Sequence, residues 1–224
     1  MSLHLQRDLD ALKKEILQLG NLVESAINTA ILALNNREAS LGMKVASLEQ
    51  EINEKEVYIE EECLKILALH QPVAVDLRFI VVVLKVNNDL ERMGDFADNI
   101  AKRAMFLSTQ EPIPVFREFV SDLPVLVRSM VRKSLDALVT LDVDLANTVI
   151  EMDDQVDEIN RRMYSEVQKI IHNDVSKTEV AISLLSSSRY MERIADLSTN
   201  IAEDVLFMVE GKVIRHHDPE QDDD

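Results

Sequence analysis

The chain has 224 residues, of which 46% are hydrophobic and 29% charged, with only four glycines and five prolines. This composition is typical of long helices and disfavours sheet architectures, which need many turns. The length suits two bundles of about one hundred residues each. The formal net charge of −17 repels phosphodiester backbones, so we expect no nucleic-acid binding.

Three long helices are predicted in the first half of the chain, because apolar residues recur there in alternating steps of four and three. They cover about residues 5–30, 38–69 and 72–107. The run 79–84 in the third helix is apolar and mostly β-branched, and in isolation it would predict a strand. We interpret it as helical because its flanks keep helix periodicity, and we expect this helix to be covered on every side.

Pro112 and Pro114 interrupt the helical pattern, since neither fits a helix interior. We place a domain boundary there, after which helical periodicity resumes over about residues 123–138, 145–170 and 176–210. Gly211 is expected to end the last helix. The predicted fold is therefore all-α, with two tandem three-helix bundles over residues 1–110 and 111–212 and an acidic, disordered tail over 213–224.

Features of secreted and membrane-spanning chains are not found in this sequence. Cys63 is the only cysteine and sits among apolar residues, so we expect a buried thiol and no intrachain disulfide. The N-terminal segment has no apolar signal region, and no stretch approaches the ~18 apolar residues of a membrane span. We expect a cytoplasmic location without membrane insertion, with peripheral docking on a membrane partner left open.

An internal repeat connects the two halves. The segment 90–101 begins Leu-Glu-Arg-Met-Gly-Asp, and the segment 191–202 begins Met-Glu-Arg-Ile-Ala-Asp, so a Glu-Arg-x-x-Asp frame occurs twice. A weaker match connects residues 49–54 to residues 153–158 in the second helix of each half. The sequence therefore predicts a duplicated three-helix unit.

Oxygen-bearing side chains follow these repeats at helical spacing. In the third helix of each half, Glu91, Asp95 and Asp98 fall within roughly 60° of arc, and Glu192, Asp196 and Asn200 within roughly 80°. Matching stripes on the second helices consist of Glu49, Asn53 and Glu56, and of Asp153, Asp157 and Asn160. A single acid pair at this spacing is usually a solvated face, but the repetition favours two rows that face one another. Such rows suit Mg²⁺, Ca²⁺, Mn²⁺ or Fe³⁺ rather than Zn²⁺ or Cu, since they offer no His or Cys.

The duplicated frame, together with the segment Gln-Pro-Val-Ala-Val-Asp-Leu-Arg at residues 71–78, closely resembles the PhoU family from Leu5 to Gly211. The resemblance implies two three-helix bundles and a negative regulator of phosphate uptake and of the phosphate-starvation response. It implies an adaptor between the phosphate ABC importer and a sensor histidine kinase, and we also expect a homodimer. Some members of the family carry multinuclear iron or other metal clusters on such acid rows.

Carried over by motif position, the metal ligands implied by this resemblance form two clusters. The first uses Glu49, Asn53, Glu91, Asp95 and Asp98, and the second uses Asp153, Asp157, Glu192, Asp196 and Asn200. Asp76 and Arg78 match the family's Asp-Leu-Arg and could form a structural ion pair. The chain departs from the family where Leu48-Glu49 replaces a common Gly-Asp and where Ala195 replaces a glycine.

Two other functions are weighed against this one. A ferritin-like di-iron oxidase also gathers inward Glu residues, but it needs Glu-x-x-His on two helices, and the sequence has no such pair on any predicted helix. A metal-free helical scaffold would use the acid rows to contact a basic partner. No nucleophile-base-acid set, glycine-rich phosphate loop or zinc spacing is present, so we expect no enzymatic activity.

Overall fold

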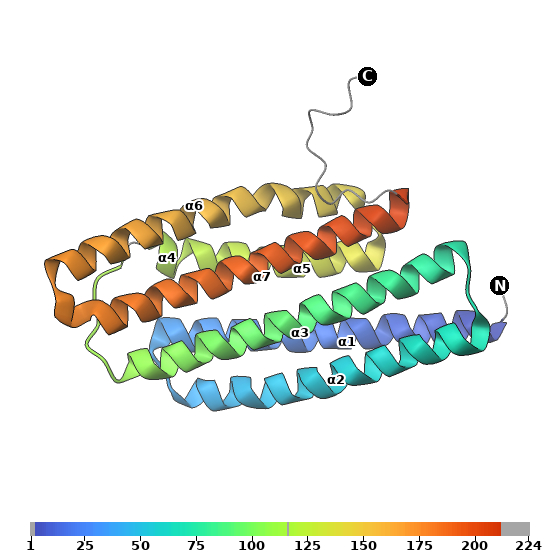
Figure 1. The fold of residues 1–224 in the computed structure, drawn as a ribbon, viewed down its shortest axis with the longest axis horizontal. Helices are drawn as coiled ribbons and strands as arrows, with labels where there is room; N and C mark the ends of the chain where they lie inside the picture. Colours follow the sequence, from blue (N-terminus) through green and yellow to red (C-terminus); the bar gives the residue numbers. More distant parts are fainter. Residues whose placement is uncertain (1–2, 116, 212–224) are drawn as a thin grey trace, which may run out of the picture.

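The computed structural model describes residues 3–115 and 117–211, and all of its regular elements are helices (Figure 1). This confirms the predicted all-α fold. The helices are α1 (Leu3–Asn36), α2 (Ser40–His70), α3 (Ala74–Ser108), α4 (Arg117–Val120), α5 (Asp122–Thr140), α6 (Val143–Asn173) and α7 (Thr178–Glu210), with a 3₁₀ turn at Val175–Lys177. The tail predicted over residues 213–224 lies outside the described residues.

The seven helices form two bundles that lie side by side (Figure 1). Helices α1, α2 and α3 pack together in the first half, and α5, α6 and α7 in the second, with the short α4 between the halves in sequence. The halves meet where α3 packs on α7 and α1 packs on α5. In Figure 1, α3 and α7 run in opposite directions. Each half therefore contacts the other through helices that occupy equivalent positions in the two repeats.

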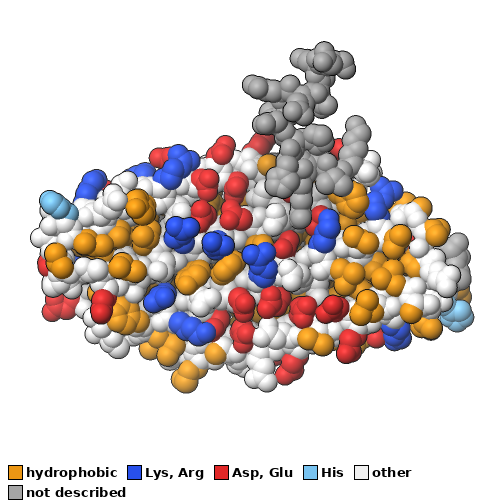
Figure 2. Space-filling model, viewed as in Figure 1, with side chains coloured by type: hydrophobic (Ala, Val, Ile, Leu, Met, Phe, Trp, Pro, Cys, Tyr) orange, Lys and Arg blue, Asp and Glu red, His pale blue; other side chains and the backbone are white. Residues whose placement is uncertain are grey.

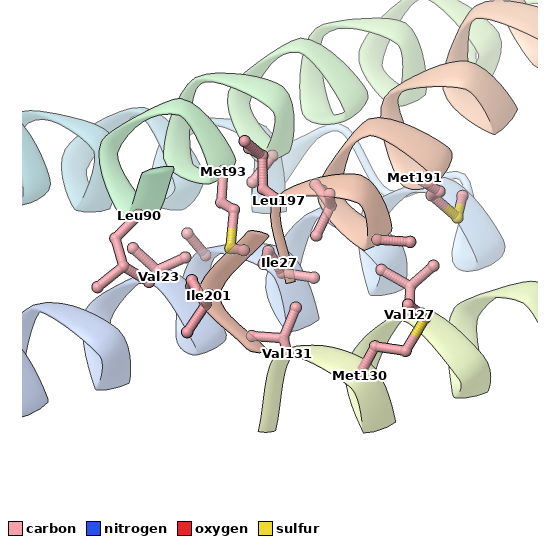
Figure 3. Close-up of a cluster of buried hydrophobic side chains, with 14 of the residues drawn as sticks. Val23, Ile27, Leu90, Met93, Val127, Met130, Val131, Met191, Leu197 and Ile201 are labelled. Atoms are coloured by element: carbon pink, nitrogen blue, oxygen red, sulfur yellow. The ribbon is translucent and has the colours of Figure 1, made fainter. Parts of the chain in front are cut away.

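One continuous apolar core joins the two bundles (Figure 3). Its members come from both halves: Val23, Ile27, Leu90, Met93, Val127, Met130, Val131, Met191, Leu197 and Ile201. Burying a side chain of this size stabilises a fold by about 1.5–3 kcal/mol relative to leaving it exposed. The interface between the halves is thus built like a protein interior rather than like a contact between independent domains.

Helix α1 is long and apolar enough, by length and composition alone, to cross a membrane, and 56% of its most apolar window is buried inside the protein. By length and composition, α1 therefore comes closer to a membrane span than the expectation that no stretch of the sequence approaches one. Its buried residues, Leu12, Leu19 and Val23 among them, line the core. A core helix of a bundle has these properties because its apolar stripe is wide.

The β-branched run 79–84 is helical, as predicted, but α3 is not covered on every side. Ile80, Val82 and Val83 are buried, whereas Val81 is 37% exposed. Helix α3 is sandwiched between its bundle partners and α7, which leaves one edge open to solvent. The predicted full cover is therefore wrong, and the helix is held by packing on several of its faces.

The turns between helices depend on a few residues with special backbone conformations. Gln71 has φ 46°, and its N–H binds the carbonyl of Leu67 to end α2, so that α3 begins at Ala74 rather than at Pro72. Gly211 has φ 75° and ends α7, as predicted. The guanidinium of Arg37 binds the carbonyls of Leu107 and Gln110, and it thereby caps the C-terminal end of α3.

Candidate cation-binding rows

The duplicated unit is visible in matched hydrogen bonds between the second and third helices of each half. In the first half, Asn87 Nδ2 donates to the backbone oxygen of Glu56 at 3.0 Å. In the second half, Ser188 Oγ donates to Asn160 Oδ1 at 2.9 Å. Both donors are buried, and each lies four residues before the glutamate of its Glu-Arg-x-x-Asp frame. These bonds fix the third helix against the second beside each acid row.

In the first half, the carboxylates of α2 and α3 face one another. Burial raises the pKa of Glu91, and the carboxylates of Asp95, Glu56 and Glu49 raise it further. Because Glu49 and Glu56 lie on α2, the effect crosses between the helices as the repeat predicts. Asn53 joins the same row, since its Nδ2 donates to Glu49 Oε1 at 2.5 Å.

Asp98 at the end of the first row already has a positive partner. Lys102 Nζ lies 2.5 Å from Asp98 Oδ2, one helical turn away on α3. The hydrogen bond to Asp98 and the charge of that carboxylate raise the pKa of Lys102. The first row is therefore partly neutralised by the protein itself, which reduces the negative charge available to an external cation.

In the second half, one carboxyl has a larger pKa shift than any in the first row. The pKa of Asp153 is raised from 3.8 to about 6, first by burial and then by the carboxylates of Asp196, Asp157, Asp154 and Glu192. Burial and neighbouring acids also raise the pKa of Glu192 and of Asp196. The acids of α6 and α7 thus share one region, and Asn200 lies one turn beyond Asp196, half-buried. A bound cation would relieve this repulsion.

Each row contains one buried oxygen atom that bears on whether the row suits a cation. Asn53 Oδ1 and Asp153 Oδ1 are buried and have no hydrogen-bond partner. Such atoms are costly unless a positive group satisfies them, and carboxyl and amide oxygens are ligands of hard cations. Within the described residues, however, no three His, Cys, Asp or Glu side chains converge closely enough to hold a metal ion. The rows therefore fit a hard cation in chemistry, while side-chain movement would have to complete the coordination.

The other residues singled out from the sequence have structural roles. No ion pair joins Asp76 to Arg78 within the described part of the chain, so that expectation is wrong. Arg78 instead packs on Gly211, since a Cβ built on this glycine would lie 2.5 Å from a guanidinium nitrogen. Cys63 is buried as predicted, and burial raises the pKa of its thiol to about 12.

Sequence reasoning missed Asn87 and Ser188, which tie the helices together beside the rows. Their signal was present, because the two residues occupy the same position of the duplicated frame. A search restricted to acids could not find them, since one is an amide and the other a hydroxyl. Extending the repeat alignment one turn before each Glu-Arg-x-x-Asp frame would have paired them.

Comparison with known proteins identifies the family. The family model described as "PhoU domain" matches residues 16–104 and again residues 120–205, one match in each half. The chain belongs to the PhoU family. Two matches by one model also agree with the internal duplication and with the paired helices α3 and α7.

Similar proteins cover nearly the whole chain. The phosphate-specific transport system accessory protein PhoU homolog of Pseudomonas putida is 36% identical over 93% of this chain and 82% of its own length. The homolog of Aquifex aeolicus is 35% identical over 94% of this chain and 95% of its own. Among solved structures, PhoU from Pseudomonas aeruginosa superposes with a TM-score of 0.90 at 34% identity, covering 92% of this chain and 99% of that one. The regulatory protein PhoU from Streptococcus pneumoniae superposes with a TM-score of 0.79 at 26% identity, covering 94% and 99% of the two chains.

Proposed function

We propose that this protein is a negative regulator of phosphate uptake and of the phosphate-starvation response. The observation that carries the proposal is that both halves match the PhoU domain and that relatives named as accessory proteins of the phosphate-specific transport system align over nearly the whole chain. In this role the protein is a cytoplasmic adaptor, acting as a homodimer between the phosphate ABC importer and a sensor histidine kinase. The proposed role requires no catalysis by the protein itself.

The acid rows are proposed to bind hard cations that set the shape of the adaptor. Glu49, Asn53, Glu91 and Asp95 would hold a cation between α2 and α3, and Asp153, Asp157, Glu192 and Asp196 would hold one between α6 and α7. A bound cation would supply positive charge that opposes both the burial and the carboxylate repulsion that raise the pKa of Glu91 and Asp153. The chain's own contribution is to hold the second and third helices together through Asn87 and Ser188.

A genetic experiment tests the regulatory role. Deleting the gene should derepress a phosphate-starvation reporter in phosphate-rich medium, because a negative regulator is lost. The wild-type gene on a plasmid should restore repression. Reporter expression that is the same with and without the gene would contradict the proposal. Pull-down of the importer and of the kinase with the full-length protein tests the adaptor step separately.

A metal-free adaptor is the second candidate, and one observation favours it. Within the residues that the structure describes, no three His, Cys, Asp or Glu side chains lie close enough together to hold a metal ion. Elemental analysis of protein purified without added metal separates the two candidates, since cation binding predicts stoichiometric iron, manganese, calcium or magnesium. The variants Asp153→Asn and Asp196→Asn should lose the metal of the second row, and Arg132→Gln, an exposed change on α5, should keep it. If the wild type contains almost no metal as purified, and still almost none after incubation with millimolar cation, the cation-binding candidate is excluded and the metal-free adaptor is supported.

A further inference from the structure

Each half of the chain has a groove between its first and second helices, and the two grooves occupy equivalent positions in the repeat. The first lies between α1 and α2, and the second lies between α5 and α6. A shift of 104 residues along the sequence places Leu22 on Leu126, and each of these leucines lines its groove. The same shift places Arg37 on Leu141, which follow the first helix of their half with φ 55° and 54°. The two grooves can therefore be compared residue by residue.

A lysine of the chain itself fills the first groove. Lys55 of α2 forms an ion pair with Glu15 of α1, and its Nζ donates to Gln18 Oε1 at 2.8 Å. The same ammonium lies 5.4 Å from the centre of the Tyr58 ring. The Lys55 side chain is only 21% exposed, so its stem covers the groove while its charge bridges the two helices. The first groove shows which kind of group this position of the fold accommodates.

The second groove keeps acids and loses the lysine. Ile159 replaces Lys55, and Val125, which is 56% exposed, replaces Asn21. Together with the half-buried Leu126, they give the groove an apolar floor. Three exposed acids form its rim: Asp122 on α5, and Asp154 and Glu158 on α6. We call this surface the acid-rimmed groove, and the described residues that line it include no Lys or Arg.

The rim carboxylates have little positive charge of the protein around them. Glu158 pairs with Arg161 at 2.9 Å, but both side chains are more than half exposed, and such a surface pair contributes little. Asp122 accepts a hydrogen bond from Ser121 Oγ, and within residues 3–115 and 117–211 neither Asp122 nor Asp154 forms an ion pair. On the face formed by α3 and α7, by contrast, Lys and Arg side chains lie among the Asp and Glu side chains (Figure 2). The acid-rimmed groove thus combines exposed apolar surface with negative charge that the chain leaves largely unbalanced.

We propose that the acid-rimmed groove binds a helical segment of a partner protein in which Lys or Arg side chains flank apolar ones. The floor buries the apolar side chains and the stems of the basic ones, while Asp122, Asp154 and Glu158 bind the charged heads. Lys55 makes the same two kinds of contact within the first half. Negative charge on both sides of the floor repels anionic lipid headgroups and acidic proteins, which leaves a basic segment as the occupant. This inference goes beyond the proposed regulatory role, which assigns no surface to a partner, and it does not depend on cations in the acid rows.

Binding of a synthetic peptide tests the proposal. The probe is a dye-labelled helix of alanine and glutamine, about 18 residues long, with three lysines beside two leucines on one face. Its twin carries glutamine in place of the lysines. Measured by fluorescence anisotropy at about 0.15 M salt, the wild type should bind the lysine peptide at least about tenfold more tightly than the twin.

Changes to the floor and to the rim should weaken this binding in different ways. Val125→Asn introduces the residue of the first groove at an exposed position, and it should weaken binding of the lysine peptide about tenfold because the floor loses apolar area. Ile159→Lys introduces a lysine at the position of Lys55, and it should prevent binding because the chain then fills this groove itself. A third variant should erase the preference for the lysine peptide over its twin, and it combines Asp122→Asn, Asp154→Asn and Glu158→Gln.

A matched control removes three exposed acids elsewhere. Glu60→Gln, Glu61→Gln and Glu179→Gln lower the negative charge by the same amount, and binding of the lysine peptide should change by less than about twofold. Equal weakening in this control, a wild type that does not distinguish the two peptides, or unchanged binding in Val125→Asn or Ile159→Lys would overturn the proposal. A wild-type homodimer that dissociates in Val125→Asn, measured by sedimentation, would also overturn it, since a second copy would then cover the groove. Circular dichroism of each variant verifies that the helices remain.

Discussion

The two acid rows occupy equivalent positions in a duplicated fold, yet they differ in how the protein handles their charge. In the first row, Lys102 pairs with Asp98 at 2.5 Å, and Asn53 donates to Glu49. In the second row, the residue that corresponds to Lys102 is Glu203. There burial, and after it the neighbouring carboxylates, raise the pKa of Asp153 to about 6. The two halves therefore keep oxygen-bearing side chains at equivalent positions but differ at the position of Lys102, which is Glu203 in the second half.

This difference predicts that the two rows are not interchangeable. The first row, in which Lys102 forms an ion pair with Asp98, gains less from an added cation. The carboxylates of the second row gain more, because Arg189 and Arg193 offset their repulsion only in part and form no ion pair with them within the described residues. We therefore expect the second row to bind cations more tightly than the first.

The largest expected effect concerns cation affinity. The double variant Asp153→Asn and Asp196→Asn should weaken the tighter class of sites by at least about tenfold, because carboxylate count sets affinity for hard cations. The matched variant Glu49→Gln and Glu91→Gln should affect only the weaker class. Isothermal titration with Mn²⁺ or Ca²⁺ on chelator-treated protein measures both classes. Equal cation affinities in the two rows would contradict the expectation that the second row binds more tightly.

The next effect is a pH dependence of stability without metal. The folded state raises the pKa of Asp153 from 3.8 to about 6, so folded protein binds this proton more tightly than unfolded protein. Its stabilising contribution is therefore complete below pH ~4 and is lost as the pH rises through ~6. Since Asp153 is only half-buried, we expect a loss on the order of 1 kcal/mol after solvent screening.

Urea denaturation between pH 4 and 7.5 measures this loss. Asp153→Asn should flatten the pH dependence in this window and should make the apo protein more stable than wild type at pH 7.5. Glu51→Gln, an exposed change on α2, serves as the control. A wild-type stability that rises steadily from pH 4 to 7.5, and does so equally in Asp153→Asn, would contradict the raised pKa of this carboxyl.

A smaller effect is expected from the lysine of the first row. Lys102→Gln removes the positive partner of Asp98, and the first row should then bind Mn²⁺ about threefold more tightly, as the charge stays partly screened by solvent. The cation affinity of the first row would then approach that of the second row. Lys44→Gln, an exposed change elsewhere in the first bundle, should leave the affinity unchanged. Weaker binding in Lys102→Gln would mean that Lys102 does not compete with the cation.

The smallest effect concerns Gly94, which the second half replaces by Ala195. A Cβ built on Gly94 would lie 3.0 Å from Ile52 Cδ1, so Gly94→Ala combines a helix-propensity gain of up to about 1 kcal/mol with crowding. We expect a net change within about 1 kcal/mol of zero. Ile52→Val should relieve the crowding, so the double variant should be more stable than the sum of the single changes. Strict additivity in urea titrations would show that Ile52 does not limit this position.

Much of the fold could be predicted from the sequence because long helices leave strong periodic signals. The ends of α2 and α7 followed from Gln71-Pro72 and Gly211, and the run 79–84 was correctly kept in a helix. The exposed edge of α3 at Val81 could not be predicted, because it depends on how the two bundles meet. The short α4 also escaped prediction, since four residues carry too little periodicity to be recognised.

The acid rows were predicted in position, because the repeat fixes which side chains share a helix face. The different degrees to which the protein neutralises the two rows were not predicted, since a pKa depends on burial and on neighbours from another helix. The expected pair of Asp76 and Arg78 failed for a related reason. Arg78 contacts Gly211, which lies more than a hundred residues away in the sequence, and no local pattern announces such a contact.

The packing of α3 on α7, and of α1 on α5, has a consequence for a chain that contains only one repeat. Each contact joins a helix to its own duplicate, which is the geometry of an isologous interface with approximate two-fold symmetry. A chain of half this length would expose the apolar surface that includes Met93 and its neighbours in Figure 3. A single repeat would therefore need a second copy, placed by the same approximate two-fold rotation, to cover this surface.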